Sequence, residues 1–126
     1  MVYKLSTVTR RDLTAGSQAV QSSHAAIQFI FEHPEVAKLW IKDPYLAQLS
    51  CADEEELKIL IEKLHKNNIK FSIFKEPDLD NQITAIAVEP SEKSRRILSC
   101  YPLMLKEYKS IDKIDKNSYK KENSYV

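Results

Sequence analysis

The sequence predicts an α/β fold with helices on both faces of a small, mixed sheet of four strands. Segments with strand-like composition alternate along the chain with segments of helical periodicity, which is the pattern of layered α/β domains. The loop at residues 76–81 is short enough to join two neighbouring antiparallel strands, so the sheet is expected to be mixed. The 126-residue chain has the usual length of one domain, which we place at residues 1–105.

The N-terminal half is expected to form two strands and two helices. Valine, threonine and tyrosine side chains favour a strand at the start of the chain. The only glycine, Gly16, ends a turn before a long helix, and Pro34 suits the first turn of a second, short helix. The expected elements are a strand at 2–10, helices from about 17 to 32 and from 35 to 42, and a strand at 45–51.

The C-terminal half contains the clearest helix of the sequence. Its first turn is acidic, which suits the positive end of a helix dipole. Its apolar side chains recur with the spacing i, i+3, i+4 and i+7, as Leu57, Leu60, Ile61 and Leu64. Residues 82–88 are an almost unbroken apolar run and are expected to form a central strand. The expected elements are a helix at 53–67, strands at 69–75 and 82–88, and a helix at 92–100.

Composition and charge exclude several classes of function. The net charge is +1, so no overall field selects nucleic acids or membranes, and any basic site has to be local. The apolar runs are too short to cross a bilayer, and the first residues lack a signal-peptide core, so a cytoplasmic protein is expected. Cys51 and Cys100 form no Cys-x-x-Cys pair and are expected to be buried, reduced thiols, so no metal site is predicted.

Residues 106–126 differ in composition from the rest of the chain. They contain six lysines and four acidic residues with little to bury, which favours a mobile, solvated tail. The lysines alternate with tyrosines, so an alternative is that this segment holds RNA by charge and stacking. The acidic residues dilute the positive charge, and the solvated tail is the preferred interpretation.

The helix at about 17–32 has one apolar and one polar side. Its apolar arc is expected to pack on the sheet and contains Ala19, Val20, Ser23, Ala26, Ile27, Ile30 and Phe31. A row of polar residues lies beside that arc and contains Ser17, Gln21, His24 and Gln28. His24 is therefore expected at the edge of the buried face, where an imidazole can be held firmly and still reach solvent. A lone helical histidine is more often a packing residue than a catalytic one.

The start of this helix is a candidate anion site. Gly16 allows the backbone to turn with a positive φ and allows a ligand to approach closely. A helix N-terminus attracts anions, and ligands of α/β proteins bind beyond the carboxyl ends of the strands. The first strand ends at Arg10 and Arg11, so both guanidinium groups are candidates to bind phosphate.

The loop before the last strand is a second candidate wall of a site. It carries Glu76, Asp78 and Asp80, and Pro77 stiffens it. A carboxylate in this position can orient a histidine or position a water molecule. The alternative, which this stretch alone favours, is a solvated acidic turn.

Several of these motifs together resemble the type 2 peptidyl-tRNA hydrolase family. Asp12-Leu13 followed by Gly16 and by Gln21-x-x-His24-Ala25-Ala26 is similar to the signature helix of the family. The stretch 83–90 is similar to its closing strand, and the acidic start of the helix at 53–57 is similar to its middle helix. The resemblance covers about residues 3–92. It implies a three-layer α/β/α fold and cleavage of the ester between a peptide and the 3′ end of tRNA.

The resemblance also implies a set of site residues. His24, Gln21, Asp78 and Thr84 would be catalytic, and Glu76 is the alternative to Asp78. Beside these, the residues at the end of the first strand, at the start of the helix and in the acidic loop are the expected substrate contacts, namely Arg10, Arg11, Gly16, Ser17 and Glu76. Members of the family need no metal or organic cofactor, so none is expected. Many are dimers, so a homodimer is an expectation here, and the expected partner is tRNA or a similar acyl-RNA.

The sequence departs from the family pattern in two places. Ser17 stands where the family has a lysine, and the loop at 77–82 is shorter than usual. The Glu76-Pro77-Asp78 loop and the His33-Pro34 pair are similar to a divergent bacterial or phage branch. Losing a cation beside the reacting group lowers the rate on the order of a hundredfold. The alternative function is therefore a catalytically weak or inactive family member that acts as an RNA- or protein-binding module.

Overall fold

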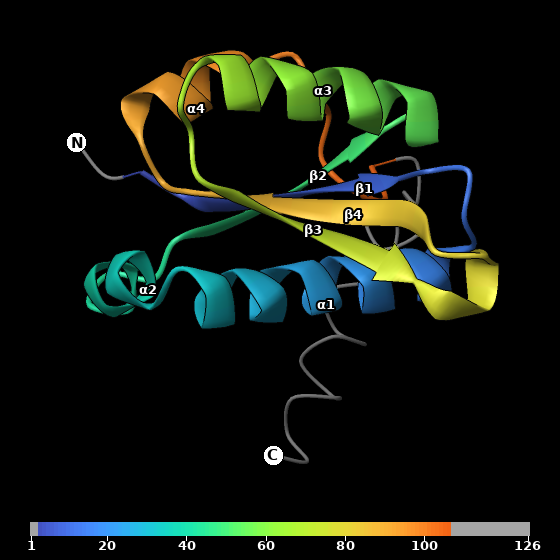
Figure 1. Cartoon of the computed structure of the whole chain (residues 1–126), viewed down its shortest axis with the longest axis horizontal. Coiled ribbons are helices and arrows are strands. Elements are labelled where there is room, and N and C mark those ends of the chain that lie inside the picture. Colours follow the sequence, from blue (N-terminus) through green and yellow to red (C-terminus); the bar gives the residue numbers. More distant parts are fainter. Residues whose placement is uncertain (1–2, 107–126) are drawn as a thin grey trace, which may run out of the picture.

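The computed structural model describes residues 3–106 and has the predicted α/β architecture. A sheet of four strands lies between two layers of helices (Figure 1). The strands are β1 (Leu5–Arg10), β2 (Leu46–Cys51), β3 (Phe71–Glu76) and β4 (Gln82–Val88). The helices are α1 (Ala15–Glu32), α2 (Pro34–Trp40), α3 (Glu54–Lys66) and α4 (Glu92–Leu98). The expected elements are all present, with boundaries that differ by a few residues. The proposed tail lies outside the described residues, apart from Lys106.

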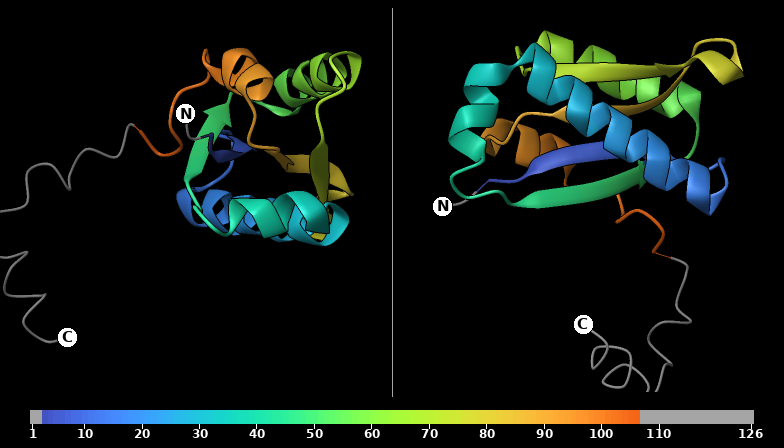
Figure 2. Two further views of the ribbon diagram at one scale, coloured as in Figure 1. Left: turned by 90° about the vertical axis from the view of Figure 1, so that its left-hand side faces the viewer. Right: turned by 90° about the horizontal axis from the view of Figure 1, so that it is seen from below.

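The strand order in the sheet is β2-β1-β4-β3. β1 and β2 are parallel, whereas β4 is antiparallel to both of its neighbours, so the sheet is mixed as predicted. β4 occupies an interior position, which agrees with its apolar sequence. α1 and α2 cover one face of the sheet, and α3 and α4 cover the other (Figures 1 and 2).

The larger hydrophobic core lies between the sheet and the layer of α3 and α4. Its buried residues are Val8, Cys51, Leu57, Leu60, Leu64, Ile69, Ile86, Val88 and Leu98. α3 has the inward-facing leucines that its periodicity predicts, and its N-cap Asp53 accepts a hydrogen bond from the backbone N–H of Glu56. The core on the α1 side is smaller and contains Leu5, Ala25, Phe29, Ala85 and Ala87.

The predicted inner face of α1 is wrong. Val20, Ile27 and Phe31 are exposed, with Phe31 retaining 81% of its accessible surface. The buried positions are Gln18, Gln21, Ser22, Ala25 and Phe29. The physical reason is that the sheet presents hydroxyl groups to α1. The hydroxyl of Thr7 in β1 is 2.8 Å from that of Ser22, for example, and a buried hydroxyl needs a polar partner.

Gly16 does not have the predicted positive φ. It lies within α1, and no glycine among the described residues has a positive φ. The chain turns instead at the extended N-cap residue Thr14, whose side chain accepts a hydrogen bond from the Ser17 N–H. A side chain at position 16 would meet nothing within 4 Å, so this part of α1 is open to its surroundings.

The two cysteines differ in environment. Cys51 is buried as predicted, but Cys100 is exposed, because it follows the end of α4. Both are free thiols. Burial raises the pKa of the Cys51 thiol to about 12, so almost none of it is thiolate at neutral pH. Cys51 therefore lies in the core as a neutral thiol.

The segment after α4 returns to the outer edge of β2 (Figure 2). The N–H of Ser50 donates to the carbonyl of Pro102, and the N–H of Met104 donates to the carbonyl of Gln48. Leu103 thereby forms an antiparallel bridge with Leu49. Across residues 3–106, none of the helices has the length and apolar content needed to cross a membrane.

Candidate active site

The site begins with a buried hydrogen bond between α1 and β4. The Thr84 hydroxyl donates to the side-chain oxygen of Gln21 over 2.6 Å. Thr84 is fully buried and Gln21 is only 4% exposed. Because its oxygen is engaged, Gln21 offers the amide N–H₂ group to other acceptors, and none of residues 3–106 accepts from that group.

A β-bulge explains why Thr84 points towards α1. In the pairing of β3 with β4, Phe74 lies opposite Ala85, but the next residue, Lys75, lies opposite Ile83. Thr84 is therefore an extra residue with no partner in β3. Side chains normally alternate between the two faces of a strand, and an extra residue breaks that alternation. Bulges of this type re-aim side chains and are frequent beside active sites.

Two side chains from other elements hold the bulge. The backbone N–H of Ile83 donates to the Glu54 carboxylate of α3 over 2.9 Å. The Ile83 carbonyl accepts from the guanidinium of Arg10, which also binds the side-chain oxygen of Gln82. Both backbone groups of the residue before Thr84 are thus bound by side chains, which fixes the path of the strand at this point.

The structure gives Arg10 and Arg11 different environments. Arg10 is buried, and its guanidinium makes two parallel hydrogen bonds to the Asp12 carboxylate in addition to its contacts with β4. These hydrogen bonds hold the pKa of Asp12 below its ordinary value and raise the pKa of Arg10 further. The side chain of Arg11 is exposed at the end of β1.

His24 lies one turn after Gln21 on the flank of α1 that faces β3. Its ring stacks on that of Phe74, with the ring centres 4.5 Å apart and the planes inclined by only 9°. His24 remains exposed, and its ring makes no hydrogen bond within the described part of the chain. Two residues of the predicted polar row of α1 therefore contact the sheet. Gln21 contacts β4, and His24 contacts β3.

The acidic loop lies at the same end of the molecule as the start of α1 (Figure 1). Pro77–Leu79 form a single 3₁₀ turn, and Asp80 and Asn81 both have left-handed backbone conformations, with φ of 52° and 60°. The loop is closed by a hydrogen bond from the Asn81 N–H to the carbonyl of Glu76. Asp78 is exposed and Glu76 is half-buried. Neither carboxylate is hydrogen-bonded to His24 within residues 3–106.

The start of α1 adds a second polar group beneath the helix. Gln18 is buried and donates from its amide nitrogen to the carbonyl of Leu13 over 2.7 Å. The amide oxygen of Gln18 and the hydroxyl of Thr9 are buried without a partner among the described residues. Ser17 is half-buried and Gly16 is exposed, so the first turn of α1 is accessible beside this polar layer.

Sequence reasoning missed four residues that shape the site. Phe74 stacks on His24, Glu54 holds the bulge, and Gln18 and Ser22 belong to the polar layer. One signal was available, because Thr7 and Thr9 alternate with Val8 along β1 and so lie on the same face. Within residues 3–106, no three His, Cys, Asp or Glu side chains lie close enough together to hold a metal ion.

Comparison with known proteins gives a family match over most of the chain. The sequence model of the family described as Peptidyl-tRNA hydrolase PTH2 matches residues 3–103. A similar solved structure is that of a protein of unknown function from Agrobacterium tumefaciens strain C58. It has a TM-score of 0.61 and 12% identity, and the match covers 79% of this chain and 96% of that one. That likeness shows the fold alone. No curated protein matches the sequence.

Proposed function

The chain belongs to the PTH2 family of peptidyl-tRNA hydrolases, and from that premise we propose that it hydrolyses the acyl ester at the 3′ end of tRNA. The observation that carries the proposal is the buried hydrogen bond between Thr84 and Gln21, with the exposed His24 one turn away. The β-bulge and the hydrogen bonds from Arg10 and to Glu54 fix the backbone beside Thr84, which supports a functional role for the position of its side chain.

His24, Gln21 and Thr84 each have a role in the proposed hydrolysis. Water attacks the ester carbonyl carbon and transfers a proton to the imidazole of His24. The amide N–H₂ of Gln21 donates to the oxyanion that develops on the carbonyl oxygen, and Thr84 holds that amide in position. The bond to the ribose oxygen then breaks, and this oxygen takes the proton back from His24. The products are a free peptide carboxylic acid and a tRNA with a free 3′ end.

The acidic loop at residues 76–81 is proposed to form the other side of the active site. We assign to Asp78 the role of steering the water or the imidazole, and Glu76 is the alternative because it is less exposed. The first turn of α1, with Gly16 and Ser17, would face the 3′ end of the RNA. Arg11 is the better candidate for a phosphate contact, because Arg10 is engaged by Asp12 and β4.

Some expectations from the sequence stay predictions. These are membership of the divergent bacterial or phage branch, a homodimer, a cytoplasmic location and independence of cofactors. The proposed steps use only side chains and water, so they require no metal ion.

The test is the release of peptide from peptidyl-tRNA by the purified protein. His24→Ala and Asp78→Ala are expected to lower turnover on the order of a hundredfold each. His65→Ala and Asp80→Asn are the matched controls, because they remove an exposed histidine of α3 and the charge of another acid of the same loop, and asparagine tolerates the left-handed backbone of position 80. Turnover that ignores His24 in a folded variant would exclude this mechanism.

A second candidate function is a binding module without efficient catalysis. It is favoured by Ser17 in the place of the family's lysine and by the absence of a hydrogen bond to the His24 ring within residues 3–106. Binding of tRNA with no release of peptide would support it. Restoration of turnover by Ser17→Lys would show that the site has lost only a cation.

A further inference from the structure

A pocket lies between α4 and the strands β1 and β2, on the face of the sheet opposite α1. Its volume is about 250 Å³, whereas a water molecule occupies about 30 Å³ in the liquid. Pockets for small ligands have volumes from about 300 Å³ upwards, so this one is large enough for a compact organic molecule. The proposed hydrolysis uses none of the residues that line it.

The pocket exists because small side chains lie where the sheet passes beneath α4. Ser6 of β1 lies opposite Ala47 of β2 in the parallel pairing, and both residues line the pocket. α4 has only seven residues and buries only Ser94 and Leu98, whereas its neighbour α3 buries three leucines. The layer of helices is therefore thin at this point, and the space above the two small side chains stays open.

Two cationic residues line the pocket, and no acidic residue does so in the described part of the chain. Lys4 directly precedes β1, and Arg95 belongs to α4. Neither side chain forms a salt bridge within residues 3–106. The nearest acid of α4, Glu92, is paired with Arg96 over 3.0 Å instead. The two free positive charges favour an anion as the ligand.

Two hydroxyl-bearing residues add hydrogen-bond donors to this lining. Ser6 is only 8% exposed, and its hydroxyl has one long hydrogen bond of 3.4 Å to the carbonyl of Lys4. Tyr101 lines the same pocket, and its hydroxyl makes no hydrogen bond to any described residue. Burial raises the pKa of Tyr101 to about 12, so its hydroxyl keeps its proton at neutral pH and can donate it to an anion.

We propose that this pocket binds a small organic anion, in which a carboxylate or phosphate group is attached to a compact apolar group. The anionic group would contact Lys4 and Arg95, and the apolar group would pack on Ala47, Leu49 and Leu98. An inorganic anion leaves this apolar lining unfilled, and a neutral molecule leaves the two cations without a partner. The inference is independent of hydrolysis, because the pocket and the candidate active site lie on opposite faces of the sheet.

NMR titrations of the full chain with phenyl phosphate and with benzoate test the proposal. Saturable shifts are expected at the amides of Ser6, Leu49 and Tyr101, with a dissociation constant below about 1 mM for at least one probe. The tighter probe identifies the anionic group. Benzyl alcohol lacks the charge and inorganic phosphate lacks the ring, so each should bind at least about tenfold more weakly. Inorganic phosphate that binds as tightly as phenyl phosphate would indicate an adventitious ion only. Shifts confined to Gln21 and Thr84 would place the probe at the other site. Either result overturns the proposal.

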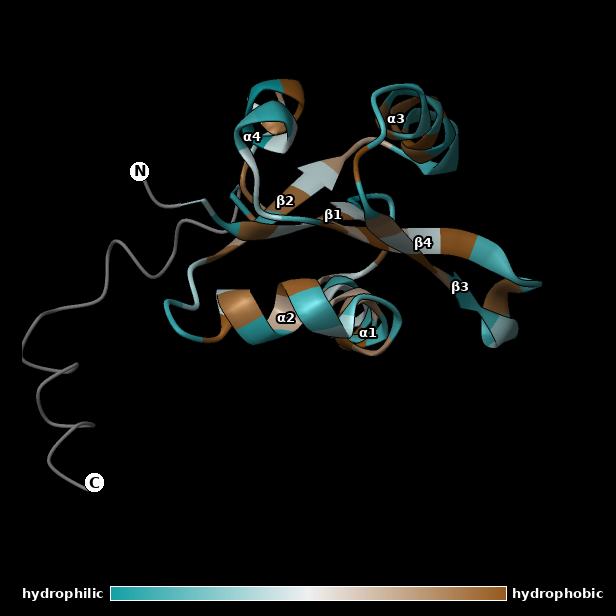
Figure 3. Cartoon of the chain, turned by 60° about the vertical axis from the view of Figure 1, so that its left-hand side comes forward, coloured by the Kyte–Doolittle hydropathy of each residue, from teal (hydrophilic) through white to brown (hydrophobic). Residues whose placement is uncertain are grey.

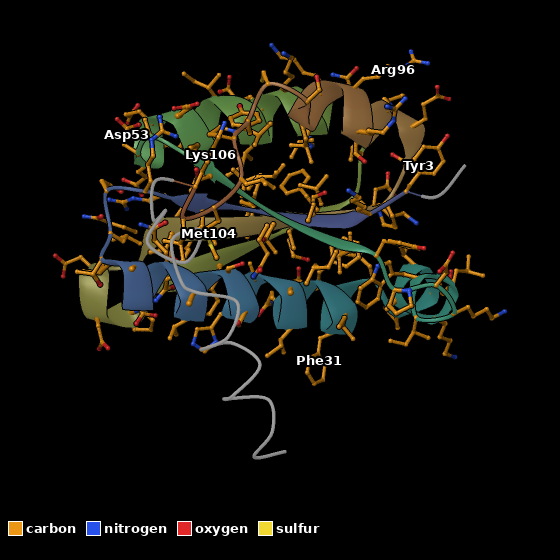
Figure 4. All side chains as sticks on the ribbon, turned by 180° about the vertical axis from the view of Figure 1, so that it is seen from behind. Tyr3, Phe31, Asp53, Arg96, Met104 and Lys106 are labelled. Carbon is orange, nitrogen blue, oxygen red and sulfur yellow. The ribbon has the colours of Figure 1, made fainter. Side chains whose placement is uncertain are left out.

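Substitutions locate the binding site. Arg95→Gln should weaken binding about tenfold or more, because it removes a charged hydrogen-bond donor. Ala47→Leu should block binding, because it fills the pocket and leaves both cations in place. Arg96→Gln is the matched control, because Arg96 is 71% exposed and projects from α4 away from the sheet (Figure 4). Equal weakening by the two arginine variants, or unchanged binding by a folded Ala47→Leu variant, would overturn the proposal.

Discussion

α1 and α3 cover opposite faces of one sheet, and they differ in which side chains they bury against it. α3 buries Leu57, Leu60 and Leu64 and turns most of its charged residues to solvent (Figure 3). α1 buries two glutamines and a serine and turns Ile27 and Phe31 outwards. α3 contains seven lysines and acids in 13 residues, whereas α1 has a single one, Glu32, in 18.

The difference follows from the two faces of the sheet. Towards α3 the strands present Val8, Ile86 and Val88, which favour leucine as a partner. Towards α1 they present hydroxyls such as those of Thr7 and Thr84, which need hydrogen-bonding partners. One layer therefore supplies hydrophobic stability, and the other holds polar groups in fixed positions at the candidate site. Which side of a helix is buried depends on its partner surface as much as on its own sequence.

The largest expected loss of stability comes from a substitution in the apolar core between α3 and the sheet. Leu60→Ala should lower the free energy of unfolding by about 2 to 5 kcal/mol, because it removes a buried side chain and leaves a cavity. Ile59→Ala, one residue earlier and 66% exposed, should change it by less than about 0.5 kcal/mol. Urea unfolding followed by circular dichroism measures both. Similar values for the two variants would contradict the assignment of the α3 inner face.

A smaller effect is expected in the polar layer, where stability and activity should separate. Gln21→Met leaves the buried Thr84 hydroxyl without its acceptor and should cost about 1 to 3 kcal/mol of unfolding free energy. Adding Thr84→Val should recover most of that loss, because neither polar group then remains. Peptide release should stay low in both variants. Recovery of turnover in the double variant would exclude Gln21 from the chemistry.

The smallest effect concerns the ion pair that supports the bulge. Arg10 holds the pKa of Asp12 below its ordinary value of 3.8, so the pair stabilises the fold above that pH and the stabilisation is lost as the pH falls through the lowered pKa. Asp12→Asn should therefore lose less stability between neutral and acidic pH than the native chain does. The Asp12 side chain is 41% exposed, so the difference should be below about 1 kcal/mol. Urea unfolding midpoints at pH 7 and pH 3 measure this difference. An equal change in stability between the two pH values for the native chain and the variant would contradict a stabilising ion pair between Arg10 and Asp12.

The sequence predicts the fold because most of its signals are local. The spacing of the leucines in α3, the apolar run of β4 and the short loop at 76–81 define α3, the interior strand and the antiparallel connection. The row of Ser17, Gln21 and His24 is local too, since it follows from helix geometry alone. The resemblance to the hydrolase family added Thr84, which its own neighbourhood does not distinguish from other strand threonines.

What could not be predicted depends on contacts between distant segments. The bulge at Thr84 exists only relative to the register of β3, and its support comes from Glu54 and Arg10 in two other elements. The burial of the polar side of α1 required knowing which strand side chains face it. The stacking of His24 on Phe74 joins residues 50 positions apart, and no spacing rule predicts such a pair.

The bridge between Leu103 and Leu49 has a consequence for how separate molecules behave in a concentrated solution. β2 is an edge strand of the sheet, and an unpaired edge strand is a template to which strands of other chains can add and aggregate. The segment after α4 occupies the N–H of Ser50 and the carbonyl of Gln48, so those groups are not available for such growth. A chain shortened to residue 101 would keep every strand and helix of the fold and lose this seal. It should therefore precipitate before it unfolds.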